Sequence, residues 1–347
     1  HNSQSPQPLQ LNQTTTCQLL QQHGYISSEQ LSLCLGDHFS VLAAVSGRRL
    51  GLSECFHQFR YERWNCSATV ARNIESGGKQ RRTKEQAFMQ AVMSAGVVFT
   101  VTEACSSGKL LRCSCLSIPS SSSSSSSSNN NNNRFNDDTW KWGGCSDDID
   151  YGLSYAKLFT DKPIKKQLLK NGIFRMSDLK GLVDLHNNEV GRQILSSLMK
   201  IKCRCHGVSG LCGVRTCWKS LPTFREVGDA LKNKYETSIE ISRPSQHLLK
   251  REKRRRRREP ISSADLIFLK KSPDYCKQNL KKGIPGTRGR LCNKNSTGPD
   301  GCDYLCCGRG FNLAETRLVE RCHCKFIWCC SVQCKMCERV EIKYTCK

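Results

Sequence analysis

Four cysteines enclose a single serine in one short segment, Cys203 to Cys217, which reads CRCHGVSGLCGVRTC. In an oxidised protein, nested pairing of Cys203 with Cys217 and of Cys205 with Cys212 would pin a hairpin, because two cross-links remove most of its loop-closure freedom. Ser209 would lie at the rigid, exposed tip of that hairpin. Its hydroxyl could then act as a nucleophile or accept a covalent group.

A serine hydrolase would use the Ser209 hydroxyl as its nucleophile. Hydrolases of the best-known kind place this serine in a G-x-S-x-G sequence at a strand-to-helix turn. Here residues 207–211 read GVSGL, and a disulfide-pinned hairpin is not a strand-to-helix turn. We therefore predict that the chain has no catalytic residues and is not an enzyme.

The cysteine content indicates the compartment and the number of modules. The chain has 24 cysteines among 347 residues, which is typical of secreted disulfide scaffolds. Twelve cysteines precede residue 218 and twelve lie between Cys276 and Cys346, so each part can pair its own thiols. We predict a secreted, disulfide-rich protein of the α+β class with two modules.

Apolar periodicity indicates the elements of the first module. The segments that begin at Glu29, run from Glu85 to Val101 and run from Ser177 to Ile201 all have helical spacing of apolar residues. The second segment should be a buried core helix, and its polar interruptions make it too short to span a bilayer. The third leads directly into the cysteine hairpin. We therefore predict a helical N-terminal domain, residues 1–240, that carries the long disulfide-pinned hairpin at 203–217.

A polybasic linker, residues 241–265, follows this domain. The formal net charge of the chain is +24, and the linker holds an unbroken arginine run: Arg254, Arg255, Arg256, Arg257 and Arg258. A block of like charges repels itself and stays extended. Three interpretations stay open: a solvated linker, a docking strip for sulfated polysaccharide or anionic membrane, and a cleavage site for basic-specific proteases. The lack of interleaved aromatic residues and the disulfide framework argue against nucleic acid as a partner.

The C-terminal domain, residues 266–347, has too many cysteines and too few apolar residues for a conventional core, so cross-links must stabilise it. The segments 317–328 and 331–344 predict disulfide-stapled β-hairpins in a small, cysteine-knot-like domain. An apolar and aromatic cluster lies at their turn, together with a tight vicinal pair of Cys329 and Cys330. Because a small module has little interior, an exposed contact surface is an alternative to a core role for Phe326 and Trp328.

A zinc site is an alternative use of the cysteines. The C-x-C pairs, the Cys334-x-x-Cys337 pair and the nearby His206 and His323 are residue types that bind zinc. Regular C-x2-C pairs with matched partners are missing, however, and thiols oxidise in secreted proteins. We therefore predict no metal ion and interpret both histidines as ordinary turn or strand residues.

Two further features fit an exported protein. N-x-Ser/Thr sequons at Asn12, Asn65 and Asn295 predict glycosylation sites. Residues 120–133 are a run of serines and asparagines that cannot bury apolar surface, so they should form a disordered insert in the N-terminal domain.

A set of motifs along almost the whole chain resembles the Wnt family of secreted ligands. The motifs are ECFHQFR from Glu54, RWNC from Arg63, KWGGC from Lys141, NNE from Asn187, CRCHGVSGLC from Cys203, LCCGRG from Leu305 and CHCKFIWCCSVQCKMC from Cys322. The number and order of the cysteines also fit the family framework. These motifs do not assign a subfamily.

The resemblance implies a complete pairing of the cysteines. The implied pairs are Cys17 with Cys34, Cys55 with Cys66, Cys105 with Cys113, Cys115 with Cys145, Cys203 with Cys217, Cys205 with Cys212, Cys276 with Cys307, Cys292 with Cys302, Cys306 with Cys346, Cys322 with Cys337, Cys324 with Cys334, and Cys329 with Cys330.

The resemblance also implies that Ser209 carries a mono-unsaturated fatty acyl ester, added during secretion by the acyltransferase Porcupine, with Wntless as the carrier. Leu211 stands where family members often have a second serine, so Ser209 is the only hydroxyl at the hairpin tip. No other cofactor is expected. At about 0.8 kcal/mol per buried methylene, a sixteen-carbon chain could contribute roughly 10 kcal/mol, of which only part appears as affinity.

The function implied by the resemblance is to bring two receptors together. The acylated hairpin and the C-terminal tip would grip the cysteine-rich domain of Frizzled receptors, and a co-receptor of the LDL-receptor-related class would bind another surface. The implied receptor contacts are His206, Gly207, Val208, Ser209, Gly210, Phe326, Ile327, Trp328, Cys329, Cys330 and Val332. The protein would be found in the extracellular space and matrix, associated with membranes through its lipid, with heparan sulfate proteoglycans as further partners. The alternative is a secreted heparin-binding matrix protein without receptor activity.

Overall fold

The computed structural model describes residues 13–66, 82–116, 140–169, 176–212, 215–241, 262–279 and 284–347. It divides into two compact units, His1–Gln58 with Ile74–Ser272 and Phe59–Asn73 with Pro273–Lys347. Helices and strands are both present and are cross-linked by many disulfides, which confirms the predicted α+β, disulfide-rich class. The serine and asparagine insert, the arginine run and the Asn12 sequon lie outside the described residues.

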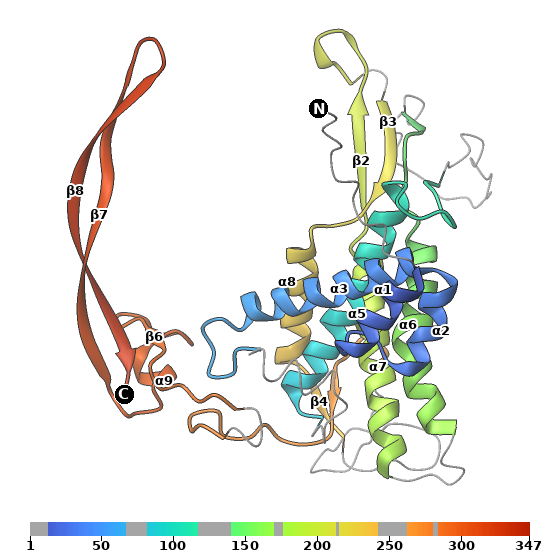
Figure 1. Ribbon diagram of the computed structural model, residues 1–347, viewed down its shortest axis with the longest axis horizontal. Helices are drawn as coiled ribbons and strands as arrows, with labels where there is room; N and C mark the ends of the chain where they lie inside the picture. The colour runs from blue at the N-terminus through green and yellow to red at the C-terminus, as the bar shows by residue number, and fades with distance from the viewer. Residues whose placement is uncertain are drawn as a thin grey trace, which may run out of the picture. The chain divides into compact units, whose positions relative to one another are not determined.

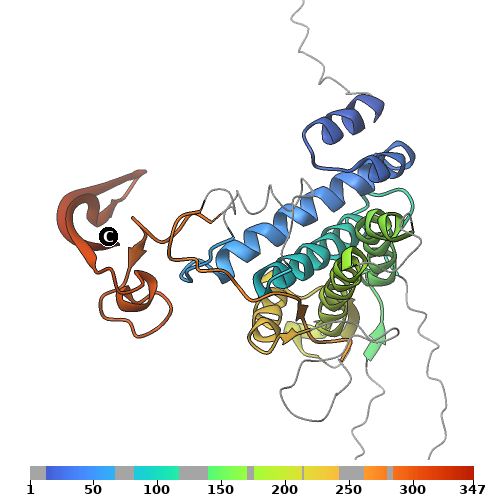
Figure 2. The ribbon, with the colours of Figure 1, turned by 90° about the horizontal axis from the view of Figure 1, so that it is seen from below.

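The first unit is a bundle of helices from which a hairpin projects (Figure 1). Its α-helices are α1 (Gln13–Gln22), α2 (Ser28–Gly36), α3 (His38–Gln58), α5 (Lys84–Ser106), α6 (Ile149–Leu169), α7 (Met176–Ser197) and α8 (Phe224–Glu236). Capping boxes begin α2 at Ser27, α5 at Thr83 and α8 at Thr223, where paired side chains satisfy backbone N–H groups of the first turn. Helix α5 packs against α3, α6, α7 and α8 and runs through the middle of the bundle (Figure 2).

Helix α5 is the buried core helix that its sequence predicts. The side chains of Phe88, Met89 and Val92 have no exposed surface. By length and composition this helix could cross a membrane, so the prediction that the segment is too short to do so is wrong. The reason is that its small polar residues lower the mean hydropathy only slightly. Since 78% of the apolar window is buried inside the unit, α5 has the environment of a core helix in a folded domain.

Helices α3 and α5 approach each other closely at two glycines. A Cβ atom added to Gly96 would lie 2.1 Å from the carbonyl oxygen of Gly47, and one added to Gly47 would lie 2.3 Å from the carbonyl oxygen of Gly96. Both distances are far below van der Waals contact with backbone atoms that cannot move aside. The crossing therefore requires glycine at both positions.

Replacing Gly96 with alanine is expected to lower the free energy of unfolding by about 1–3 kcal/mol, because the two helices must separate to admit the methyl group. Urea denaturation of the secreted protein measures this change. Gly36→Ala is the matched control, since nothing lies within 4 Å of a Cβ there and the backbone is not left-handed. Equal denaturation midpoints for Gly96→Ala and the wild type would show that the helices do not pack as described.

The projecting hairpin of the first unit belongs to a small three-stranded sheet. Its strands are β1 (Trp140–Trp142), β2 (Lys200–Cys205) and β3 (Arg215–Ser220), in the order β1-β3-β2. Strands β2 and β3 are antiparallel, with Cys203 directly opposite Cys217, and β1 runs parallel to β3. Helix α7 ends at Ser197 and leads into β2. The predicted helix before the cysteine hairpin is thus present, but its predicted last residue, Ile201, lies in β2.

A short parallel pair, β4 (Ile239–Glu240) and β5 (Ile267–Phe268), lies at the two ends of the predicted linker. The side-chain amide of Asn187 in α7 accepts a hydrogen bond from the N–H of Ile267 and donates one to its carbonyl oxygen, each at 3.0 Å. Residues 262–272 therefore pack with the first unit, which differs from the expected start of the second domain at residue 266. A strand-like pairing of only two residues gives too weak a pattern to be seen in the sequence.

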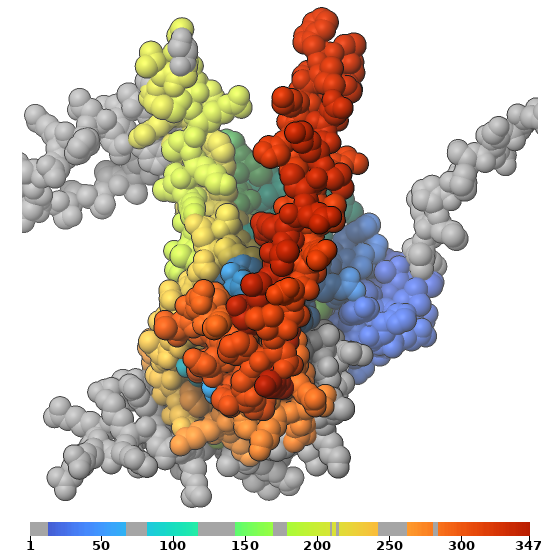
Figure 3. Space-filling model, turned by 90° about the vertical axis from the view of Figure 1, so that its left-hand side faces the viewer, coloured from blue at the N-terminus to red at the C-terminus, as the bar shows by residue number. Residues whose placement is uncertain are grey.

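The second unit is a long two-stranded ribbon on a small base, and the space-filling view shows the ribbon as a narrow red column (Figure 3). Its elements are β6 (Leu291–Cys292), α9 (Cys302–Leu305), β7 (Phe311–Ile327) and β8 (Ser331–Cys346), with the strand order β6-β8-β7. The hairpin is thus present, and β7 begins six residues before the predicted start at residue 317. The core of the base consists mostly of half-cystines around Leu305, with Phe311 and Tyr344 packed against it. This is the cross-link-dominated core that the composition predicts.

The segment from Phe59 to Cys66 belongs to the second unit. The guanidinium of Arg290 donates hydrogen bonds to the carbonyl oxygens of Arg60, Glu62 and Arg63. The Arg63 guanidinium in turn donates to the carbonyl oxygen of Tyr304. These contacts join residues more than two hundred positions apart in the sequence, so apolar periodicity could not reveal them.

Ten disulfides implied by the family resemblance are present. They are Cys17–Cys34, Cys105–Cys113, Cys115–Cys145, Cys203–Cys217, Cys205–Cys212, Cys276–Cys307, Cys292–Cys302, Cys306–Cys346, Cys322–Cys337 and Cys324–Cys334. Cys55 and Cys66 are also disulfide-bonded, and they are the two that remain once these pairs and the two free thiols are set aside.

Candidate functional site: two cross-linked hairpin tips

The first hairpin tip is closed by its own backbone. Residues Val208–Gly210 form a single 3-10 turn, η1, with Ser209 as its middle residue. The N–H of Gly207 donates to the carbonyl oxygen of Leu211 at 2.9 Å, and the N–H of Leu211 donates to that of Val208 at 3.3 Å. Together with the Cys205–Cys212 disulfide, these bonds hold the tip in one conformation.

Two glycines beside Ser209 are required by this geometry. A Cβ added to Gly207 would lie 2.2 Å from the carbonyl oxygen of Leu211, so a larger residue would open the tip. Gly210 has a φ of +78°, a left-handed conformation that glycine adopts without strain. The sequence GVSG therefore presents the serine on a rigid turn.

The tip is apolar and exposed around the serine. The side chain of Val208 is 85% exposed and that of Leu211 is 69% exposed. The His206 ring nitrogen Nε2 lies 2.9 Å from the hydroxyl of Thr216, so this histidine is engaged with the hairpin stem. The segment between Cys203 and Cys217 contains no aspartate or glutamate. The tip is thus an exposed apolar surface that its own backbone hydrogen bonds hold in place.

Asp147 anchors the base of this hairpin, and sequence reasoning missed it. Its carboxylate accepts a hydrogen bond from the N–H of Leu221 at 2.7 Å and one from the hydroxyl of Ser106 at 2.5 Å. Its own N–H donates to the carbonyl oxygen of Lys219. Asp147 lies two residues after Cys145, the last residue of the KWGGC motif, so its closeness to a half-cystine was the one available signal.

A buried charge cluster holds α6 and α7 together below the hairpin. Arg192 is 2% exposed and donates to both carboxylate oxygens of Asp161, which is 3% exposed, at 3.1 and 2.9 Å. Asn188 also donates to Asp161, at 2.9 Å. Burial alone would raise the pKa of Glu189, but its hydrogen bonds from Arg192 outweigh that effect and hold the pKa below its usual value. This cluster fixes the helix that positions β2.

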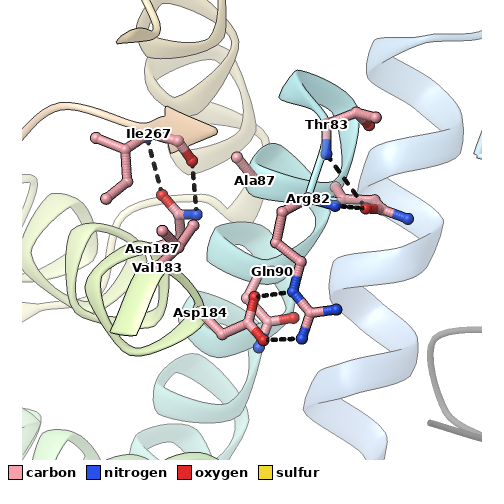
Figure 4. A pocket seen from close by; sticks show the side chains of 9 residues that line it. Arg82, Thr83, Ala87, Gln90, Val183, Asp184, Asn187 and Ile267 are labelled. Atoms are coloured by element: carbon pink, nitrogen blue, oxygen red, sulfur yellow. Dashed lines mark hydrogen bonds and ion pairs between the residues drawn. The ribbon is translucent and has the colours of Figure 1, made fainter. Parts of the chain in front are cut away.

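A small polar hollow lies between α5, α7 and β5 (Figure 4). Its polar groups bind one another: Arg82 contacts the carboxylate of Asp184 at 3.0 and 2.5 Å, and Asn187 binds the backbone of Ile267. Burial raises the pKa of Asp184, and Arg82 opposes that change. Because these side chains form hydrogen bonds with neighbouring groups of the fold, we interpret the hollow as part of the helix packing rather than as a ligand site.

The tip of the second hairpin is the most exposed apolar cluster of its unit. Phe326 lies opposite Val332 and Ile327 opposite Ser331, and the turn between them contains Trp328. Trp328 is 91% exposed, Phe326 71% and Val332 62%. This confirms the alternative that the cluster is exposed rather than a core. Two disulfides in the ribbon directly below, Cys322–Cys337 and Cys324–Cys334, hold it in place.

A β-bulge aligns this cluster with the rest of the ribbon. Between the pairs Cys322↔Lys335 and Lys325↔Gln333, β7 has one more residue than β8, and His323 there has a φ of +45°. The extra residue moves Phe326 to the face that also carries Val319, because side chains alternate along a strand. His323 is therefore the bulge residue. Although it lies near Cys322 and Cys337, those cysteines are joined in a disulfide and cannot bind a metal as thiolates.

The prediction of a vicinal disulfide between Cys329 and Cys330 at the tip is wrong. Cys329 and Cys330 are exposed free thiols whose Sγ atoms are 3.3 Å apart, well beyond the roughly 2.05 Å of a disulfide bond. Both residues have left-handed backbones, with φ of 70° and 88°. The hydrogen bond between them raises the pKa of the Cys330 thiol. Both remain part of the expected contact surface, as thiols.

The remaining expected sites lie on the surface or outside the described residues. Asn295 is exposed and Asn65 is half-buried, so at least the former is accessible to a glycosyltransferase. The side chain of Ser209 is not described, and its position is known from the backbone of η1. The two hairpin tips thus bring together Val208 and Leu211 in one unit and Phe326, Trp328 and Val332 in the other.

Together, the fold and the two tips define a class: a disulfide-rich protein of the extracellular type that presents rigid apolar hairpin tips. The family model described as "wnt family" matches residues 22–347. The chain therefore belongs to the Wnt family. Members of this family are secreted signalling ligands rather than enzymes, and they carry a lipid modification.

Similar proteins cover nearly the whole chain. The chain is 44% identical over 332 residues to Protein Wnt-16 of Bos taurus and 43% identical over 329 residues to Protein Wnt-16 of Mus musculus. Each match covers 93% of this chain and 86% of the relative. Among solved structures, a chain from human WLS in complex with WNT8A matches with a TM-score of 0.61 and 35% identity, covering 88% of this chain and 94% of that one.

Proposed function

We propose that this Wnt family protein is a lipid-modified ligand in which Ser209 carries a fatty acyl group and enters an apolar groove of the Frizzled cysteine-rich domain. The observation that carries the proposal is the rigid 3-10 turn at Ser209, flanked by the exposed Val208 and Leu211. A tip fixed by two disulfides loses little conformational entropy on binding. Its apolar flanks extend the surface that an acyl chain would bury.

The Ser209 hydroxyl is also the group on which we base two proposed partners during export, an acyltransferase and a carrier. A serine in the middle of a turn that cannot fold away, with the exposed neighbours Val208 and Leu211, would be accessible to an acyltransferase such as Porcupine. The similar WNT8A chain was solved in complex with human WLS. We extend that partnership to this chain and propose Wntless as its carrier. The lipid would then keep the secreted protein associated with membranes and matrix.

The second receptor contact is the tip of the β7–β8 ribbon. Large exposed aromatic side chains such as Trp328 and Phe326 are common hot spots of protein interfaces. An LDL-receptor-related co-receptor would bind a different surface, and heparan sulfate would bind the arginine run at 254–258. Titration of the secreted protein onto immobilised Frizzled cysteine-rich domain tests the proposal. The heparin-binding matrix alternative predicts no saturable binding.

Replacing Trp328 with alanine is expected to weaken binding to the Frizzled cysteine-rich domain by about thirtyfold, or about 2 kcal/mol, because a large aromatic contact is lost. The fold should be unaffected, since 91% of this side chain is exposed. Biolayer interferometry measures the affinity. Leu111→Ala, at an equally exposed residue of the first unit, is the matched control. If both variants bind as the wild type does, the ribbon tip is not a receptor contact.

A further inference from the structure

Strand β7 has an unpaired edge. In the described part of the chain, β7 pairs with β8 on one side and with no strand on the other. A free edge exposes a row of backbone N–H and C=O groups that can pair with another strand. Native proteins therefore usually protect such edges with charged side chains, lysine above all, or with proline or a bulge.

Over its first twelve residues the edge of β7 carries charges of both signs, which a second copy could complement, rather than the lysines that repel one. The segment 311–322 reads FNLAETRLVERC and contains no lysine, proline or glycine. Strand β8, in contrast, carries Lys335 and Lys343, and β6 covers its base. The bulge at His323 limits the flat edge of β7 at its far end.

Two charged residues of this edge, Glu315 and Arg321, would face each other if β7 paired with an antiparallel copy of itself. Glu315 and Arg321 are exposed on one face, where their partners in β8 are Ile342 and Met336. Neither has a charged partner directly opposite within the ribbon. In an antiparallel pair of two β7 strands centred on Leu318, each Glu315 lies directly opposite Arg321 of the second copy. Residues directly opposite lie on the same face, so both pairs are attractive.

We propose that two copies of this protein associate through the β7 edges, antiparallel and centred on Leu318, to form the four-stranded sheet β8-β7-β7-β8. Each half of the symmetric interface supplies one Glu315–Arg321 pair, and the two Leu318 side chains meet on the axis. About nine residue pairs, roughly 30 Å of strand, take part. The buried area is on the order of 1,000 Å², which places the dimer among weak, concentration-dependent interfaces.

Sedimentation velocity of the secreted full-length protein at tens of micromolar tests the proposal. A nonionic detergent above its critical micelle concentration is present, so that an acyl chain cannot drive association. The wild type is expected to form dimers, and E315R and R321E are each expected to weaken the dimer by at least about tenfold, because like charges then face each other at two places. A wild type that stays monomeric throughout this range would overturn the proposal.

Mixing the two variants gives the decisive result. An equimolar mixture of E315R and R321E places opposite charges at both positions, so heterodimers should form where neither variant dimerises alone. E338R is the matched control, because Glu338 lies on the same face but on β8, away from the free edge, and this variant should dimerise as the wild type does. An E315R protein that dimerises as well as the wild type, or a mixture that fails to associate while the wild type does, would refute the proposed register.

Discussion

Replacing Ser209 with alanine is expected to reduce binding to the Frizzled cysteine-rich domain by at least about a hundredfold, or ~2.7 kcal/mol. The physical reason is the loss of the acyl chain, whose buried methylenes each contribute about 0.8 kcal/mol before the costs of association. The turn itself should persist, because it is held by the Cys205–Cys212 disulfide and by backbone hydrogen bonds. Interferometry with purified protein at matched concentration measures the affinity.

The control for this prediction removes a hydroxyl from the same hairpin far from its tip. Ser220 lies at the end of β3, opposite Lys200, so Ser220→Ala should bind as the wild type does. Because loss of the acyl group could also change how much protein is exported, the Ser209→Ala protein is recovered from cells as well as from medium before its affinity is compared. An affinity within threefold of the wild type would show that receptor binding does not depend on an acyl group at Ser209.

Replacing Arg192 with alanine is expected to lower the free energy of unfolding by about 3–5 kcal/mol, because it leaves the buried carboxylate of Asp161 without its counter-charge. Since a domain is typically stable by only about 5–15 kcal/mol, the amount of secreted protein should fall sharply. Chemical denaturation and the yield of secreted protein measure the effect. The expected loss is large because both partners are almost fully buried, at 2% and 3% exposed.

Two further variants test whether the loss of stability comes from the buried charge cluster rather than from any substitution of a charged residue. Lys166→Ala removes a half-exposed partner of Glu29, an ion pair at 3.5 Å, and should change stability by less than about 1 kcal/mol. The double variant Asp161→Asn with Arg192→Met removes both buried charges and should be more stable than Arg192→Ala alone. If Arg192→Ala unfolds at the same denaturant concentration as Lys166→Ala, the cluster does not stabilise the bundle.

Local patterns in the sequence predicted the features that depend on neighbouring residues. The apolar spacing of Glu85 to Val101 indicated the core helix, and the nested cysteines indicated the hairpin whose tip is η1. The ribbon was also predicted from its strand-like segments, although β7 begins at Phe311. The pairing of ten disulfides came from the family resemblance, since spacing alone allows many connectivities.

Features that depend on distant contacts were not predicted. Arg192 and Asp161 lie 31 positions apart on different helices, so no local pattern in the sequence indicates that they meet. Asn187 and Ile267 lie 80 positions apart in the sequence, and two hydrogen bonds join them. Residues up to Ser272 therefore pack with the first unit rather than with the second. The free thiols of Cys329 and Cys330 follow from the backbone of one turn, which adjacent cysteines alone do not determine.

The most direct test of the central claim is mass spectrometry of the secreted, non-reduced protein, in which the peptide that contains Ser209 is searched for a fatty acyl mass. The account predicts a mono-unsaturated acyl ester on Ser209, since this is the only hydroxyl at the tip of the hairpin. An unmodified Ser209 in protein whose hairpin disulfides are intact would contradict it, and would make the heparin-binding matrix protein the better description of this Wnt family member.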